Sequence, residues 1–166
     1  MDTFDSYVLF AIIALPMAGA VVLTLVPGYR PGLVRWTATA FALATMLLSF
    51  YAFLAYDHEA GGFQLTRTWR WLSLPGDWPL ADQAITLALG VDGISVLMVL
   101  LTGIVMFTGV LVSWNIADRN KDFFILYFLL LSGVFGVFAS LDLFFFFFFY
   151  ELSVLPMYLL IGVWGS

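Results

Sequence analysis

Glu151 is the residue of this sequence whose position most clearly suggests chemistry. It is the ninth residue of an apolar stretch, 143–166, that carries no other charge. A carboxyl group inside a bilayer costs at least ~2.5 kcal/mol to insert, so it should face protein or water and have a partner. Apolar surroundings favour the neutral carboxyl group and a nearby cation favours the carboxylate, so between these influences the group can bind and release a proton. We interpret Glu151 as an intramembrane proton relay; the alternative is a protonated, hydrogen-bonded structural residue.

Pro156 follows Glu151 by five residues in the same stretch. Proline lacks an amide hydrogen, and its ring clashes with the carbonyl group four residues earlier, here that of Leu152. We therefore expect a kinked or locally opened helix beside the carboxyl group, with a free carbonyl oxygen that could bind water. Packing alone is an equally good reason for a proline in a membrane helix.

Six consecutive phenylalanines, at 144–149, precede Glu151. Such a run faces every side of a helix and therefore shows no preference for one face. It could insulate Glu151 from water on the outer side of the membrane, although lipid and helix packing is the simpler explanation.

The rest of the composition excludes several kinds of site. The sequence has no cysteine, which excludes disulfides, thiolate-bound iron–sulfur clusters and a cysteine nucleophile. His58 is the one histidine, so a histidine-rich metal site or a bis-histidine haem site is excluded as well. A net charge of −5 argues against nucleic acid as a partner. We expect no cofactor, metal or redox site in this chain itself.

The helices that must position Glu151 are predicted from long stretches of sequence with few charged residues. Apolar residues make up 63% of the sequence and charged residues 10%, which leaves too little polar surface to cover a soluble fold. Apolar stretches long enough to cross about 30 Å of hydrocarbon as helices occupy residues 7–27, 36–56, 93–117, 123–141 and 143–166. The sequence therefore predicts an all-α integral membrane protein, with two transmembrane helices in 1–56, an extramembrane loop at 57–92 and three transmembrane helices in 93–166.

The loop at 57–92 carries two alternating patterns that predict a β-hairpin. Apolar residues alternate with others at Phe63, Leu65, Trp69 and Trp71 and again, beyond the turn-rich segment 74–77, at Ile85, Leu87, Leu89 and Val91. Trp69, Trp71 and Trp78 would also suit the aromatic belt at a membrane surface. The simplest interpretation of this hairpin is a cap with no chemistry of its own.

Positive charge is unevenly distributed between the loops. The first and third loops carry Arg30, Arg35, Arg119 and Lys121, whereas the N-terminal tail carries only acids. The positive-inside rule then places these two loops in the cytoplasm, and the N-terminus and the 57–92 loop outside. An N-terminus without basic residues is also not expected to be a cleavable signal peptide.

Several polar and small residues predict local structure rather than chemistry. Asp92 and Asp142 each stand before an apolar stretch and are expected to cap a helix N-terminus. Ser132, Gly133 and Gly136 form a group of small residues that lets another helix approach closely.

The apolar stretches contain no cationic partner for Glu151, because all six Lys and Arg residues lie in loops. Glu151 is therefore expected to be protonated at rest, or to pair with a residue from further sequence or from another subunit. On this reasoning, the 166 residues are not the whole functional unit.

Two motifs resemble the antiporter-like membrane subunits of complex I, and the resemblance covers all 166 residues. The first is Leu-Gly-Val-Asp-Gly-Ile-Ser at 89–95, followed by an apolar helix that ends in Ser113 and Trp114. The second is Asp142-Leu143, the phenylalanine run and Tyr-Glu-Leu-Ser-Val-Leu-Pro-Met-Tyr at 150–158, which is similar to the fifth helix of these subunits. The Pro-Met-Tyr sequence points to the M type of NADH-quinone oxidoreductase subunit.

The resemblance implies a function and a site. In that family the glutamate of the fifth helix is an essential group of the proton channel, a role that falls on Glu151 here, and its partner is a lysine on the seventh helix, beyond Ser166. The chain would be the N-terminal part of a proton-translocating subunit, with 93–166 as the start of the translocating region. It would act within an enzyme, NADH:quinone oxidoreductase, whose NAD, flavin and iron–sulfur clusters lie in partner subunits.

The expected location is the bacterial inner membrane, with an organelle membrane as the alternative. Two other functions stay open from the residues. Subunits of multisubunit cation/proton antiporters and of membrane-bound hydrogenases share these motifs, and a non-pumping membrane scaffold would carry Glu151 merely as a buried acid.

Overall fold

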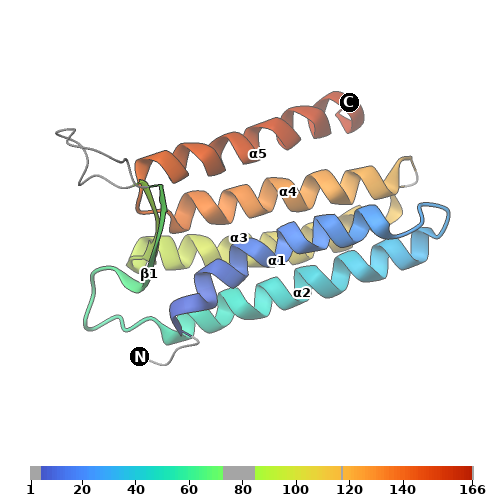
Figure 1. The fold of residues 1–166 in the computed structure, drawn as a ribbon. Coiled ribbons are helices and arrows are strands. Elements are labelled where there is room, and N and C mark those ends of the chain that lie inside the picture. Colours follow the sequence, from blue (N-terminus) through green and yellow to red (C-terminus); the bar gives the residue numbers. More distant parts are fainter. Residues whose placement is uncertain (1–4, 73–84, 117, 166) are drawn as a thin grey trace.

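The computed structural model describes residues 5–72, 85–116 and 118–165, and within them it contains five long helices and a two-stranded antiparallel sheet (Figure 1). The elements in chain order are α1 (Asp5–Leu25), α2 (Pro31–Ala55), β1 (Gln64–Leu72), β2 (Ile85–Val91), α3 (Gly93–Val112), the short 3-10 helix η1 (Ser113–Asn115), α4 (Asn120–Ala139) and α5 (Leu143–Trp164). All five helices are long and apolar enough to cross a membrane. The prediction of an all-α membrane protein with a hairpin in its 57–92 loop is confirmed. The predicted turn at 74–77 and Trp78 lie outside the described residues, as do Ala117 and Ser166 at the ends of two predicted spans.

Helices α1, α2 and α4 begin before the apolar stretches that predict them, at their N-terminal ends, whereas all five helices end before those stretches do. Helix α2 begins at Pro31, five residues before the predicted span, and α4 begins at Asn120 and includes Lys121 and Asp122. Apolar stretches mark only the part of a helix that fits the hydrocarbon, whereas a helix can continue into the polar interface. Pro31 also suits the first turn of a helix, where no amide hydrogen is needed.

Helices α1 to α4 pack around a common core, and α5 packs on α4 at the edge of the bundle (Figure 1). Helix α4 is central, since it contacts α1, α3 and α5. The largest fully buried side chains are apolar and come from all four inner helices; they include Leu9, Ile12, Leu23, Val34, Val96, Met106, Phe124, Phe128 and Phe135.

Hydroxyl groups within the bundle are satisfied mostly by the carbonyl groups of their own helices. The Thr45 hydroxyl donates to the Phe41 carbonyl oxygen at 2.9 Å, and the Ser49 hydroxyl donates to that of Thr45 at 2.9 Å. Ser132 instead donates to the carbonyl oxygen of Ile13 on α1, at 2.8 Å. An unpaired hydroxyl would be costly in apolar surroundings, so these bonds allow polar side chains in the bundle.

The hairpin is joined to α1 through Arg67 and Trp69 of β1. The Arg67 guanidinium donates to the hydroxyl oxygens of Ser6 (3.0 Å) and Tyr7 (2.7 Å), and lies 4.3 Å from the centroid of the Tyr7 ring. The Trp69 ring packs against Phe10, with 5.5 Å between ring centroids. Arg67, which the sequence presents only as a loop charge, thus fastens the sheet to the bundle.

The hairpin is also joined to the junction between α4 and α5. The backbone amide of Leu141 donates to the Ala88 carbonyl oxygen at 2.8 Å, and Leu89 forms an antiparallel bridge with Ser140. We call the end of the bundle that carries the sheet the hairpin end; the chain turns between α1 and α2 and between α3 and α4 at the other end, where α5 also finishes (Figure 1).

Candidate functional site

Glu151 lies on the outer face of the edge helix α5, about 12 Å along the helix from Leu143. Its side chain is exposed. Together with Phe144, Phe147 and Phe148 it lines an open groove with a volume of about 340 Å³. The acid thus faces away from α4, towards the space beside the bundle.

Glu151 has no hydrogen-bond or ion-pair partner among residues 5–72, 85–116 and 118–165. The ion pair found in this part of the chain joins Arg119 to Asp122, at 2.9 Å, at the end of the bundle away from the hairpin. The described basic residues lie in strand β1 of the hairpin or near the starts of α2 and α4, where Arg35 and Lys121 are helical rather than in loops as predicted. The structure therefore offers Glu151 a groove but no cation.

Pro156 does not lie on the same face as Glu151. Its ring is buried, whereas the Glu151 side chain is exposed, and α5 remains helical through it. Because proline has no amide hydrogen, the carbonyl oxygen of Leu152 lacks its usual helical donor. The free carbonyl group stays a prediction, and α5 continues as a helix past Pro156 to Trp164.

Small residues of α4 set the orientation of α5. A Cβ atom added to Gly133 would lie 2.7 Å from the Ser153 amide nitrogen and 2.8 Å from the Phe149 carbonyl oxygen, both in the α5 backbone. A Cβ atom on Gly136 would clash with the Phe149 ring, which is the buried phenylalanine of the run. The prediction of close helix approach at these glycines is confirmed. Seating Phe149 against α4 turns Glu151, two residues later, to the opposite face.

The start of α5 is fixed by a cap and by the hairpin. The Asp142 carboxylate accepts hydrogen bonds from the amides of Phe144 (2.9 Å) and Phe145 (3.3 Å), so its predicted capping role is confirmed. The Trp71 ring of β1 packs against the same two phenylalanines, with centroid distances of 5.6 and 5.7 Å. Leu141, the residue before the Asp142 cap, is held to β2 by its hydrogen bond to Ala88.

The far end of α5 is held by Trp164. Its indole Nε1 donates to the Asp118 carbonyl oxygen at 3.0 Å, and its ring packs edge-on to Phe123 with centroids 5.5 Å apart. Sequence reasoning missed this tie and the contacts of Trp71 with α5. The available signal was weak: a tryptophan near the end of an apolar helix, or in a loop, fits the interfacial belt equally well.

The other polar candidates have structural surroundings. Asp92 caps α3, accepting from the amides of Ser95 (2.7 Å) and Ile94 (3.2 Å) as predicted. His58 packs against the rings of Phe53 and Tyr56. In the described part of the chain, no three His, Cys, Asp or Glu side chains come together as a metal site would require. What the arrangement offers chemically is one carboxyl group, within an apolar helix, facing an open groove.

Comparisons with known proteins agree with the motifs. No family model matches the chain. The chain is 38% identical over 160 residues to NAD(P)H-quinone oxidoreductase chain 4 3 of Picosynechococcus sp., an alignment that covers 95% of this chain and 28% of the relative. It is 37% identical over 157 residues to the chloroplastic NAD(P)H-quinone oxidoreductase chain 4 of Chara vulgaris, covering 93% and 30% respectively.

A third relative is named as a ubiquinone oxidoreductase subunit. The chain is 33% identical over 159 residues to NADH-ubiquinone oxidoreductase chain 4 of Marchantia polymorpha, covering 95% of this chain and 30% of that protein. The chain thus spans less than a third of the length of each of these relatives.

Proposed function

Because the chain is homologous to chain 4 of the NAD(P)H-quinone oxidoreductases, we propose that it is the N-terminal part of an M-type, antiporter-like subunit that couples quinone reduction to proton translocation. Electron transfer takes place in partner subunits, which hold the NAD, flavin and iron–sulfur clusters. The chain itself lies in a bilayer, in contact with lipid and with other membrane subunits of the complex.

The position of Glu151 carries the proposal. It is the one charged residue of the α5 sequence, and its side chain faces the groove rather than the packed core. An acid in this position is costly for a scaffold but useful for a relay, because it can exchange a proton with water or with a neighbouring group inside the membrane. Each charge moved against the membrane potential requires about 2.3 kcal/mol per 100 mV, which the redox reaction supplies through the complex.

A lysine on another membrane helix of the subunit completes the site in this proposal. The groove beside Glu151 is open and, among the described residues, contains no cation. A lysine facing the groove would stabilise the carboxylate, and weakening that pair would return the proton to Glu151. Glu151 can therefore alternate between a carboxylate paired with the lysine and a protonated carboxyl group, as the electric field of the surrounding charges changes.

Replacing Glu151 by glutamine in the full subunit tests the proposal. Glutamine keeps the size of the side chain and its hydrogen bonding but cannot release a proton. We expect Glu151→Gln to assemble into the complex and to lose proton translocation, measured as protons moved per NADH oxidised in sealed vesicles. Glu59→Gln, the same change at an exposed loop residue, is the matched control and should leave this ratio unchanged. An unchanged ratio in Glu151→Gln would instead support the scaffold alternative.

A further inference from the structure

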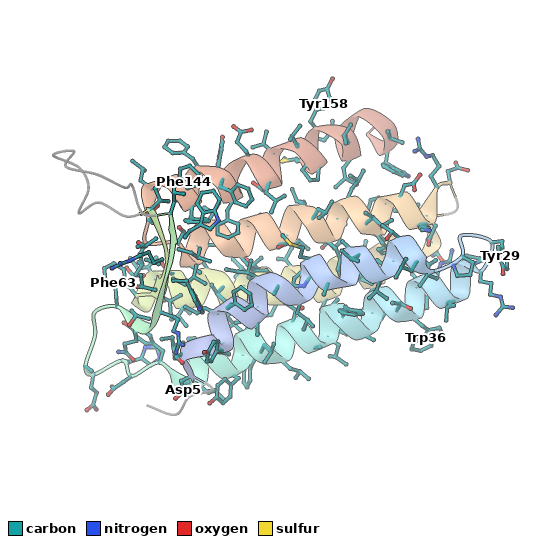
Figure 2. The ribbon with its side chains drawn as sticks, viewed as in Figure 1. Asp5, Tyr29, Trp36, Phe63, Phe144 and Tyr158 are labelled. Carbon is teal, nitrogen blue, oxygen red and sulfur yellow. The ribbon has the colours of Figure 1, made fainter. Side chains whose placement is uncertain are left out.

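Arg35 reaches from the start of α2 to the connection between α3 and α4. The sequence explains this arginine by the positive-inside rule alone, whereas in the structure its side chain is partly buried. One of its guanidinium nitrogens, Nη2, donates to the carbonyl oxygen of Ile116 at 3.4 Å. The neighbouring Trp36 packs edge-on to Trp114, with ring centroids 5.6 Å apart. Helix α2 therefore contacts the α3–α4 connection at the end of the bundle opposite the hairpin, where Figure 2 shows Trp36.

A second side chain, from the start of α4, meets the same carbonyl oxygen. Asn120 is the first residue of α4 and is only 7% exposed. Its Nδ2 donates to the Ile116 carbonyl oxygen at 3.0 Å. The guanidinium group of Arg35 and the amide group of Asn120 are thus both oriented by one carbonyl group. Because both groups are planar and rigid, anchoring one nitrogen also limits where the neighbouring polar atom of the same group can lie.

Each of these two groups has one further polar atom that is fully buried and has no hydrogen-bond partner among the described residues. These atoms are Nε of Arg35, which can only donate, and Oδ1 of Asn120, which can only accept. The Ile116 carbonyl oxygen cannot serve Nε as well, because Nη2 and Nδ2 already occupy its two lone pairs. A buried polar atom is destabilising unless another group replaces the hydrogen bonds that it made with water in the unfolded chain.

The chemistry of these two atoms restricts what can bind between them. The ligand must accept a hydrogen bond from Nε and donate one to Oδ1. A fully ionised anion cannot donate, and a metal ion cannot accept. A side chain of another subunit cannot reach them, because this chain itself shields both atoms from its surface. Water both donates and accepts, and it is the usual partner of buried polar groups that the protein leaves unpaired.

We propose that Arg35 and Asn120 bind one ordered water molecule, which bridges Nε of the arginine to Oδ1 of the asparagine. The bridge links the start of α2 to the start of α4 beside the carbonyl group of Ile116, to which both side chains also bind. Arg35 then has a structural role in addition to its charge, because it fastens three parts of the chain at one point. This role does not depend on proton translocation, so its test is independent of the proposed function.

Electron cryo-microscopy of the full subunit within its complex tests the site directly. At a resolution that shows ordered water at other buried carbonyl groups, we expect one peak within about 2.7–3.2 Å of both Arg35 Nε and Asn120 Oδ1. The peak should be lost in Asn120→Leu, which removes the acceptor. It should be kept in Arg30→Lys, a control at an exposed arginine near the same end of α2. A wild-type map without this peak, or with Nε and Oδ1 in direct contact, would overturn the proposal.

Thermal unfolding of the purified subunit measures what the bridge contributes. Arg35→Lys keeps the positive charge but removes the Nε–H group and the rigid fork, so we expect a Tm lower by about 4 °C. Arg30→Lys is the same change at an exposed residue and should leave the Tm unchanged.

The two residues should also depend on each other. In the double variant Arg35→Lys with Asn120→Leu, we expect a loss of Tm clearly smaller than the sum of the two single losses, because either single change already breaks the bridge. Fully additive losses, or an Arg35→Lys variant as stable as Arg30→Lys, would contradict a bridge between the two side chains.

Discussion

Three carboxylates of this chain show how surroundings decide what the same chemical group does. Asp92 and Asp142 stand at helix starts and accept two backbone hydrogen bonds each, so their charges are used to begin α3 and α5. Glu151 has no such partner among the described residues and faces an open groove. An acid whose hydrogen bonds are all made is stabilising, whereas an acid without them is available for exchange.

Asp92 should stabilise the protein in a pH-dependent way. Hydrogen bonds from the backbone and side chain of Ser95, helped by the amide of Ile94, hold the pKa of the Asp92 carboxyl group below its usual range. Because the folded pKa is the lower one, the stabilisation is complete above the unfolded pKa of about 3.9 and is lost as the pH falls through the folded value. Asp92→Ala should lower the free energy of unfolding by about 1 kcal/mol near neutral pH.

Thermal unfolding of the purified subunit measures this effect. The difference in Tm between the wild type and Asp92→Ala should be constant at neutral pH and shrink below about pH 4. Asp92→Asn keeps an acceptor for the Ser95 amide without a charge, so it should lose much less stability than alanine and vary less with pH. A difference that grew on acidification would contradict the assignment of the cap.

At the scale of elements, the sequence predicts the existence of α5 but not its orientation. The phenylalanine run makes every face of this helix equally apolar, so no periodicity indicates which side packs inward. The structure resolves this through α4, where Gly133 and Gly136 leave room for the α5 backbone and the Phe149 ring. The outward direction of Glu151 is thus decided by two glycines on a neighbouring helix, which single-sequence reasoning identifies only as a packing signal.

The α4–α5 contact should be sensitive to a single methyl group. In Gly133→Ala the new Cβ atom would lie within 2.8 Å of two α5 backbone atoms, which cannot rotate away, so the helices must separate. We expect a loss of about 1–3 kcal/mol, as for other overpacked sites, measured as a lower Tm of the purified subunit. Gly162→Ala is the control in α5, where nothing lies within 4 Å of the added atom; it should be neutral or slightly stabilising because alanine favours helix. Equal effects of the two changes would contradict the packing described here.

At the scale of the whole molecule, the architecture was largely predictable and the long-range ties were not. Long apolar stretches predicted the helices, because a helix that crosses a bilayer must be long and apolar. The alternation of apolar with other residues predicted the hairpin. The contacts of Trp71 with Phe144, of Trp164 with Asp118 and of Arg67 with Tyr7 join residues far apart in the chain. Local patterns carry no information about such pairs, since each partner also suits a membrane surface on its own.

The two ends of the bundle differ in charge in a way that predicts its orientation. Helices α3 and α5 begin at the hairpin end with aspartate caps, whereas α2 and α4 begin at the other end with Arg30 and Arg119 in the cap position and no side-chain cap bond. A cation at a helix start is unfavourable for the helix dipole, so these arginines do not serve helix stability. The positive-inside rule explains them instead.

We therefore expect the hairpin end to face outward from the cytoplasm. A reporter enzyme that is active only outside the cytoplasm should be active when inserted at Gly62 and inactive when inserted at Gly28, both of which are exposed and lie outside the helices and strands. A cytoplasm-specific reporter should show the opposite pattern. Reversal of both patterns would place the hairpin in the cytoplasm and would contradict the orientation expected from the positive-inside rule.

The attachment of α5 at both of its ends limits how the proposed proton translocation can operate. Trp71 and Leu141 fix one end, the contact of Gly133 with Ser153 fixes the middle, and Trp164 fixes the other end. A helix held in this way is a fixed element. It can neither slide through the membrane nor turn about its axis without breaking several contacts at once. Moving parts must then be small, namely side-chain rotamers, water and the electric field, and any larger displacement belongs to whatever stands opposite the groove.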